Sequence, residues 1–324
     1  MTTNWPVAID QVYQSRVSEL HRPLRAGELV LQEGLYVLKR PGVSITAPAS
    51  LFPDVVACRR AISPFFSNLG LHTMYLLYEI ANDEPFWRTP HITVNGTELL
   101  ERLCLRRDAR GIHYTRNRQR VAAVLGVAHH FTFAFEGQVS RPLIRVKEWS
   151  ADAWDKRLPR EVSVELLYYD GVRKNDRRGN HYVLVPRREL VTGFNLRPTT
   201  ELLAAYLCTR YQQTRHRRHV PQLTRKTLVE KAGITCNSRS WQKVTLRRAI
   251  DELIETRILA PDVQIPAADD DCLSYRWGPA LLNLTARNAF AAFDGESKRW
   301  RRRRYHQHQS GESLLCNASS SLSS

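Results

Sequence analysis

Basic and short polar side chains gather at the starts of two long helical patterns, where they could bind nucleic acid. In the first half of the chain these residues are Thr115, Arg116, Asn117, Arg118 and Arg120. In the second half they are Ser238, Arg239, Ser240, Gln242, Lys243 and Arg247. Arginine suits the acceptors of guanine, asparagine or glutamine suits adenine, and the other groups suit phosphate. We expect both sets to face a duplex, the alternative being an ordinary solvated helix face.

Further basic groups are expected to contact phosphate. They are a turn with Arg173, Lys174 and Arg177, a loop with Arg215, Arg217 and Arg218, and the helix start at Thr224 and Arg225. Metal binding by the loop is disfavoured because no carboxylate or cysteine is spaced to complete a site with its histidines. The basic run at 298–304 would bind phosphate with little sequence preference or act as a solubilising tail.

Three short patterns resemble catalytic sites, but none fits the chemistry. The stretch 305–308 (Tyr-His-Gln-His) resembles the metal-binding histidines and tyrosine of DNA-nicking enzymes, yet it lies in a basic tail with a polar middle residue. Residues 113–116 match the H-x-x-R of tyrosine recombinases without a tyrosine at a suitable distance downstream. The aspartates at 269–271 read as a solvated turn. No phosphate-binding G-x-x-x-x-G-K-[ST] loop occurs, so we predict no enzyme activity, metal or cofactor.

Each polar set opens a helix whose apolar residues recur at spacings of three and four. The first helix is expected to bury Val121, Val124, Leu125 and Ala128. The second is expected to bury Val244, Leu246, Ile250, Leu253, Ile254 and Ile258. Trp241 is predicted to be a core anchor of this second helix, in preference to a wedge between bases.

The elements around these helices repeat between the two halves. Each long helix follows a short helix and a polar turn, and a tyrosine- and leucine-rich helix precedes each group. Asn95 and Glu98 predict a capping box at the first short helix. Alternating segments follow as strands at 131–135, 143–146, 162–166, 182–185, 263–265 and 273–277. This order predicts tandem winged helix-turn-helix domains, whose third helix enters the major groove and whose hairpin can touch the flanking backbone.

The ends of the chain look simpler. Residues 1–25 contain few periodic cues and are expected to form a loose arm. Two short strands are predicted at 29–31 and 35–38 around a turn at Glu33 and Gly34, and 40–53 is interpreted as a connection. The serine-rich end has too little apolar surface to offset its ordering entropy, so a disordered tail is predicted.

Bulk composition favours a polyanionic partner. The chain has 324 residues and a formal net charge of +16, and each phosphate that it neutralises would release counterions. No apolar run approaches the length of a membrane helix, and no secretion signal opens the chain. The six cysteines form no C-x-x-C pair, which predicts a reducing, cytoplasmic setting without a disulfide framework or zinc ribbon.

The arrangement resembles the bacterial plasmid replication initiators that bind iterons, Rep proteins built from two winged-helix domains. The resemblance covers about 68–277 and rests on the order of elements and on two soft patterns. These are 98–100 followed by the turn 107–114, and 247–253 ahead of 258–259. It implies that the carboxyl-terminal domain reads a repeated origin sequence. It also implies that the amino-terminal domain contacts the backbone and can form dimers that repress the initiator's own promoter.

The sequence thus predicts an α+β fold with two tandem winged-helix domains at 61–195 and 196–294. An extension with short strands precedes them at 1–60, and a disordered basic tail follows at 295–324. The predicted function is sequence-specific binding of double-stranded DNA in plasmid DNA replication initiation, with homodimers and the host replicative helicase machinery as further partners and no membrane. The alternatives are a transcriptional regulator, a DNA-nicking relaxase-like enzyme, and an RNA-binding protein.

Overall fold

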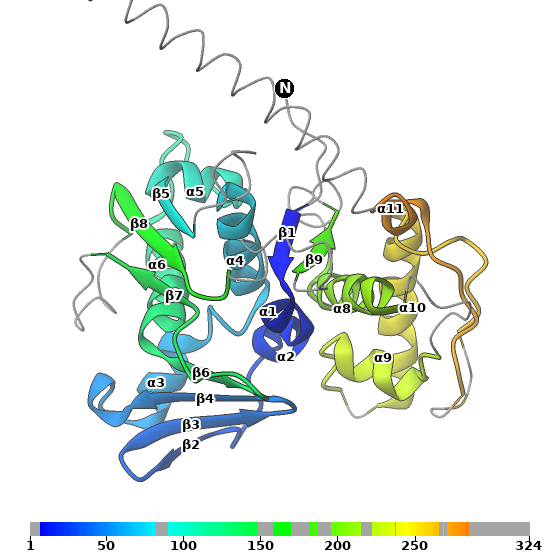
Figure 1. Ribbon diagram of the computed structural model, residues 1–324, viewed down its shortest axis with the longest axis horizontal. Helices are drawn as coiled ribbons and strands as arrows, with labels where there is room; N and C mark the ends of the chain where they lie inside the picture. The colour runs from blue at the N-terminus through cyan, green and yellow to red at the C-terminus, as the bar shows by residue number, and fades with distance from the viewer. Residues whose placement is uncertain are drawn as a thin grey trace, which may run out of the picture.

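The structure is a computed structural model that combines helices with antiparallel strands, so the predicted α+β class is confirmed. The residues that it describes are 7–81, 90–147, 158–169, 182–186, 196–214, 222–236, 238–265, 268 and 271–284. Figure 1 shows two bodies with the N-terminal segment between them. Some predicted features lie outside the described residues, namely the basic turn at 173–177, the basic loop at 215–218 and the tail at 295–324.

The first body is organised around a buried helix and a three-stranded sheet. Its elements follow in the order α4 (Asn68–Ala81), β5 (His91–Asn95), α5 (Gly96–Arg102), α6 (Thr115–His130), β7 (Ile144–Val146) and β8 (Glu161–Leu166). The last strand, β8, lies in the middle of the sheet and is antiparallel to both β5 and β7. Asn95 caps α5 by accepting from the amides of Thr97 and Glu98, as half of the predicted capping box.

A second sheet lies beside this body. It has the order β2-β3-β4-β6 and consists of β2 (Leu29–Gln32), β3 (Leu35–Arg40), β4 (Val43–Pro48) and β6 (Thr132–Phe135). The predicted hairpin is confirmed, with Glu33 and Gly34 both at positive φ between β2 and β3. Interpreting 40–53 as a connection was wrong, because β4 is a central strand whose alternate side chains are buried. Two short helices, η1 (Ala49–Leu51) and α3 (Val55–Ile62), follow it.

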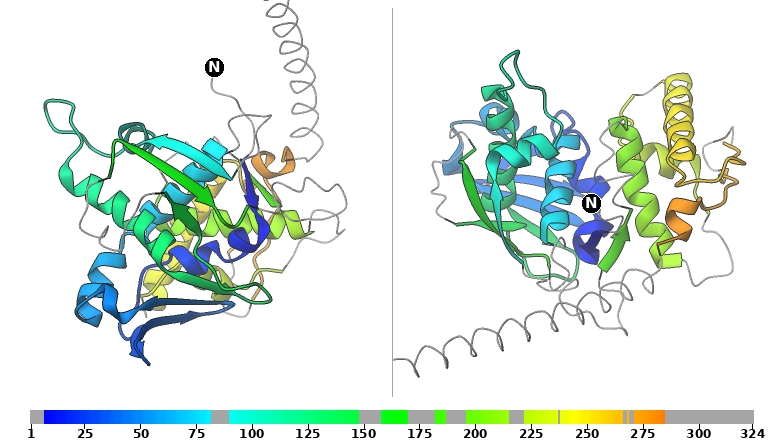
Figure 2. Two further views of the ribbon diagram at one scale, coloured as in Figure 1. Left: turned by 60° about the vertical axis from the view of Figure 1, so that its left-hand side comes forward. Right: turned by 90° about the horizontal axis from the view of Figure 1, so that it is seen from above.

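The second body is helical, with a minimal sheet. It contains α8 (Pro198–Thr214), α9 (Arg225–Lys231), α10 (Arg239–Glu255) and α11 (Pro279–Leu282). The expected hairpin is present as two isolated bridges, Gln264–Ser274 and Leu259–Trp277, and its returning segment also pairs with Thr224 through Cys272. Figure 2 shows α10, in yellow, on the side of α8 that faces away from the first body.

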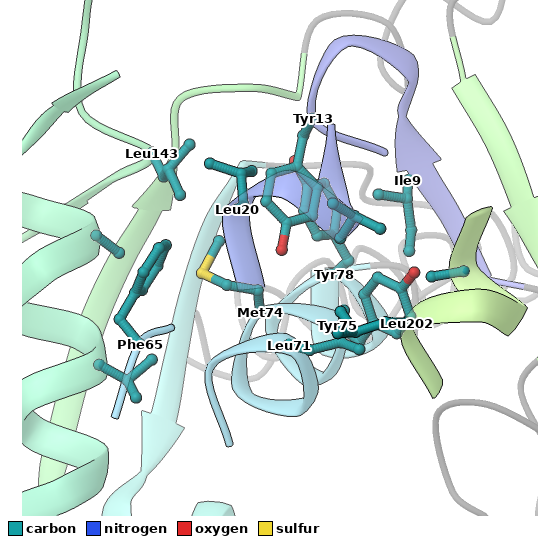
Figure 3. Packing of buried hydrophobic residues seen from close by; sticks show 14 of the residues in the cluster. Ile9, Tyr13, Leu20, Phe65, Leu71, Met74, Tyr75, Tyr78, Leu143 and Leu202 are labelled. Carbon is teal, nitrogen blue, oxygen red and sulfur yellow. The ribbon is translucent and has the colours of Figure 1, made fainter. Parts of the chain in front are cut away.

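The prediction of a loose N-terminal arm was wrong. Residues from Val7 onward form β1 (Val7–Asp10), α1 (Gln11–Ser15) and α2 (Val17–His21). β1 pairs along its whole length with β9 (Tyr182–Val185), more than 170 positions later in the chain. Side chains of this segment, among them Ile9, Tyr13 and Leu20, are fully buried beside α4 (Figure 3). Two five-residue helices are too short to show a helical period, which is why the pattern went unrecognised.

The N-terminal segment joins the two bodies through Gln14. Its amide nitrogen donates to the carbonyl of Ala205 on α8 at 3.1 Å, and its amide oxygen accepts from the Tyr75 hydroxyl of α4 at 3.0 Å. Because Gln14 is buried, each of these partners satisfies a polar group that water cannot reach. On the same interface, Glu201 of α8 lies 2.7 Å from His72 of α4.

A set of buried charges, here named the charge cluster, fixes α2 in place. Glu19 pairs with Lys231 of α9 and lies 3.6 Å from Arg22. Arg22 and Arg40 both bind Glu28, at 2.5 and 2.9 Å. Arg40 also donates to the carbonyl oxygens of Glu19 and Arg22. The cluster therefore ties α2 to β3 of the second sheet and to α9 of the second body.

Arg40→Ala should destabilise the protein by about 3–5 kcal/mol, the usual cost of removing one partner from a buried ion-pair network. The substitution leaves Glu28 with Arg22 alone among the described cations and removes the donor to the buried carbonyl oxygens of Glu19 and Arg22. Urea unfolding followed by circular dichroism measures the change. Lys39→Ala, on the exposed side of the same strand, is the matched control. A loss below about 1 kcal/mol, the ordinary range for a single substitution, would contradict the stabilising role.

The buried His21 should make the protein less stable in acid. Its Nδ1 lies 2.9 Å from the Phe65 carbonyl, which can only accept, so neutral His21 carries its proton there and accepts from Tyr13 through Nε2. Burial lowers the pKa of His21 to about 3. The unfolded chain, with a histidine pKa of about 6.5, binds this proton first, so stability falls as the pH drops from about 6.5 toward 3.

His21→Gln should flatten the dependence of unfolding free energy on pH by up to about 1.4 kcal/mol per unit in that window. Urea unfolding at several pH values measures the slope. His91→Gln, at an exposed strand position, should leave the slope as in the parent protein. Equal slopes for His21→Gln and the parent would refute the assignment.

Candidate nucleic-acid interface

Capping side chains set the ends of the two helices that hold the second polar set. Thr224 caps α9 by accepting from the amide of Thr227 at 3.2 Å. Ser238 caps α10 by accepting from the amide of Trp241, at 3.5 Å, and it also contacts the Ser240 hydroxyl. The turn between these helices passes through Gly233 at φ +68°, a left-handed conformation that suits glycine. Local residues therefore fix where α10 begins.

Two predicted contact residues, one buried and one half-buried, hold α10 in position. Arg225 is 5% exposed, and its guanidinium donates to the carbonyl oxygen of Arg239 at 3.2 Å. Gln242 is half-buried and donates to the carbonyl oxygen of Cys236 at 2.6 Å. In this structure both side chains fasten the first turn of α10 to the preceding helix and turn.

The outward face of α10 carries exposed cations and, unexpectedly, apolar side chains. Trp241 is 54% exposed and Val244 is 41% exposed, so the predictions that both would be buried were wrong. The buried side of the helix is formed by Leu246, Ala249, Ile250 and Leu253. The opposite side of its first turns faces outward, which is why an apolar period alone misplaced these two residues. Over residues 239–248 the exposed polar residues are Arg239, Ser240, Lys243, Arg247 and Arg248, the last of which was not among the predicted contact residues.

The first polar set divides into exposed and inward-turned residues. Thr115, Arg116 and Arg120 are exposed at the start of α6. Asn117 donates to the carbonyl oxygen of Arg106 at 3.0 Å, and Arg118 donates to the Thr97 hydroxyl at 3.3 Å. These two side chains hold the start of α6 against the preceding turn and helix, leaving the other three at the surface.

The turn before α6 is braced by its own side chains. The carboxylate of Asp108 accepts from the amides of Arg110 and Ile112, both at 2.9 Å. Tyr114 is exposed at the end of the turn, whereas the neighbouring His113 is buried. Because His113 is buried while Arg116 is exposed, the H-x-x-R letters do not place both side chains at one surface.

The fully exposed residues of α6 all lie in its first two turns. From Val121 to Ala128 every residue of the helix is buried, between α4, α3, α5 and β7. A helix covered on all sides cannot lie along a groove. Its cationic end can contact phosphates, whose recognition needs only a few donors.

The hairpin of the second body carries exposed carboxylates. Arg276 donates to the carboxylate of Asp262 at 2.7 Å, and this hydrogen bond holds the pKa of Asp262 below its ordinary value. Asp271, which ends the run of three aspartates at 269–271, is exposed. Since like charges repel, the exposed Asp271 does not favour the phosphate contact expected of the hairpin.

Comparisons with known proteins do not assign the chain to a family. No protein-family model matches it, and a search of curated proteins gives no match. Within the described ranges, no group of three or more histidine, cysteine, aspartate or glutamate residues could hold a metal ion. In the same part of the chain, every helix is too short or too polar to cross a membrane.

Thr224→Ala should destabilise the protein by about 1 kcal/mol, the usual cost of losing a capping hydroxyl. The cap orients α9, and α9 in turn anchors α10 through Arg225. Thr115→Ala is a matched control because Thr115 is an exposed first-turn residue of α6 with no capping role. Urea midpoints measure both changes, and equal midpoints for the two variants would refute the capping role.

Proposed function

We propose that the chain is a sequence-specific binder of double-stranded DNA with two winged-helix modules, 61–195 and 196–294. The observation that carries the proposal is the start of α10, where Arg239, Lys243 and Arg247 stand exposed around an outward-facing side of the helix. An exposed helix of about 10–12 Å diameter matches the width of the major groove, about 12 Å. The formal net charge of +16 provides the electrostatic attraction.

The order of elements supports two modules of one kind. In the first body a helix, a strand and two helices are followed, after β6 of the second sheet, by the strands β7 and β8, and β8 lies in the middle of its sheet. The second body repeats that order, with bridges in place of strands and the returning segment again in the middle. This order is typical of a winged helix-turn-helix, in which the third helix contacts DNA.

The two modules would play different parts. The second would insert α10 into the major groove, where Arg239 and Lys243 can reach base edges. The first would hold the adjacent backbone with Arg116 and Arg120, because only the end of α6 is exposed. The basic groups at 173–177 and 215–218 would add phosphate contacts, as their sequence suggests.

The biological output that we propose is initiation of plasmid replication at repeated origin sites. This step rests on the resemblance to Rep proteins, as do the homodimer, repression of the chain's own promoter and recruitment of the host helicase machinery. Several copies on adjacent repeats would strain a neighbouring A·T-rich region, since duplex deformation costs least in flexible sequences. The protein would act in the cytoplasm, on the plasmid.

Footprinting against the DNA that flanks its own gene tests this output. Directly repeated protected sites support an initiator, whereas a single palindromic site indicates a transcriptional repressor. Incubation with supercoiled origin DNA and magnesium tests the enzymatic alternative. A nicked product would identify a DNA-nicking enzyme. Stronger binding to single-stranded RNA than to duplex DNA would refute the proposal.

Arg239→Ala or Lys243→Ala should weaken specific binding by about 1–3 kcal/mol where the side chain reads a base. Substitution of a residue that contacts only phosphate should instead reduce the slope of log affinity against log salt concentration by about one. The sequence preference should then be unchanged. Fluorescence anisotropy at several salt concentrations distinguishes the two. Arg60→Ala, at an exposed position of α3, is the control. Unchanged affinity in both α10 variants would remove α10 as the reading helix.

A further inference from the structure

The outward face of α10 contains an apolar pair that its fold does not use. Trp241 and Val244 are three positions apart and therefore neighbours on one helix face. Both are well exposed, and neither belongs to the buried core of the second body. Leaving a tryptophan and a valine in water forgoes the free energy that their burial would provide. Such a pair is suited to an apolar contact with another molecule.

Cations surround this pair on the same helix. Arg247 and Arg248 follow it by one turn, and Arg239 and Lys243 flank it, all exposed. Asp251 offsets part of this charge, since it lies 3.5 Å from Arg247. An apolar strip between cations fits a polyanion that also presents an apolar group. A purely apolar protein surface would desolvate these cations without supplying anions to offset the cost.

In the major groove of duplex DNA that apolar group is the C5-methyl of thymine. We propose that Trp241 and Val244 pack on thymine methyl groups, so that the second module selects A·T pairs beneath the first two turns of α10. This inference rests on the proposed function. Three helical residues advance about 4.5 Å along the axis, and neighbouring base pairs are about 3.4 Å apart. The two side chains can therefore reach methyl groups of adjacent pairs.

The first test changes only the DNA and uses the full chain. A preferred site is selected from a pool of random duplexes, and each thymine of that site is then replaced in turn by uracil, which lacks the methyl group. Affinity should fall about fourfold at one or two thymines, since burial of a methyl group contributes about 0.8 kcal/mol. At every other thymine the affinity should be unchanged.

The second test asks whether α10 is responsible for this sensitivity. Val244→Ala and Trp241→Ala should weaken binding to the thymine duplex and should reduce the uracil effect at their own positions to less than twofold. Both side chains are exposed, so both variants should fold, which circular dichroism checks. Val56→Ala makes the same truncation at an exposed position of α3 and should leave the uracil effect intact.

Each outcome decides a separate point. Recovery of no preferred duplex would overturn both the proposed function and this inference. Recovery of a site whose affinity is the same with uracil at every thymine would overturn the inference alone. A uracil effect that persists unchanged in both α10 variants would also overturn it, because another part of the protein would then contact the methyl groups. Loss of the effect in Val56→Ala as well would show that it is not specific to α10.

Discussion

A buried glutamate that contacts one cation from the second sheet and one from the second body is the constraint on which the arrangement depends. Glu19 lies in α2 and pairs with Lys231 of α9, while the carbonyl of the same residue accepts from Arg40 of β3. An ion taken out of water without compensation costs several kcal/mol, so these contacts have to form together. This N-terminal segment is thereby held between β3, which follows soon after it in the chain, and α9, which comes much later.

This constraint also determines how the candidate interface is presented. Lys231 is the last residue of α9, and Arg225 at the start of the same helix holds the first turn of α10. The charge cluster and the proposed DNA-reading helix are therefore coupled through the length of α9. Gln14 adds a second connection between α4 and α8. Because these connections hold α10 in place before binding, the helix loses little conformational entropy when it binds, which favours affinity.

Much of the helical framework could be predicted from apolar periodicity. Helices α4, α6 and α10 have enough turns for the period to be evident, and the β2–β3 hairpin has a glycine turn. The period could not identify α1 and α2, because each has five residues and their burial depends on β9 and α8. It also misplaced Trp241, since periodicity shows which residues are apolar and not whether another element covers them.

The two bodies share an order of elements, but their long helices α6 and α10 are exposed to different extents. That difference limits which DNA contacts each helix can make. Helices α4, α3 and α5 and strand β7 pack around α6 of the first body, so its middle is enclosed and only residues such as Arg116 and Arg120 remain at the surface. No comparable layer covers α10 within the described residues, and its outward face is exposed between Arg239 and Arg248. Base recognition needs side chains along a groove, whereas a phosphate grip needs only a cationic helix end. The packing around α6 in the first body would then favour phosphate contact over base recognition. In the part of the chain that the structure describes, the outward face of α10 in the second body has no such packing, which leaves this helix available for base recognition.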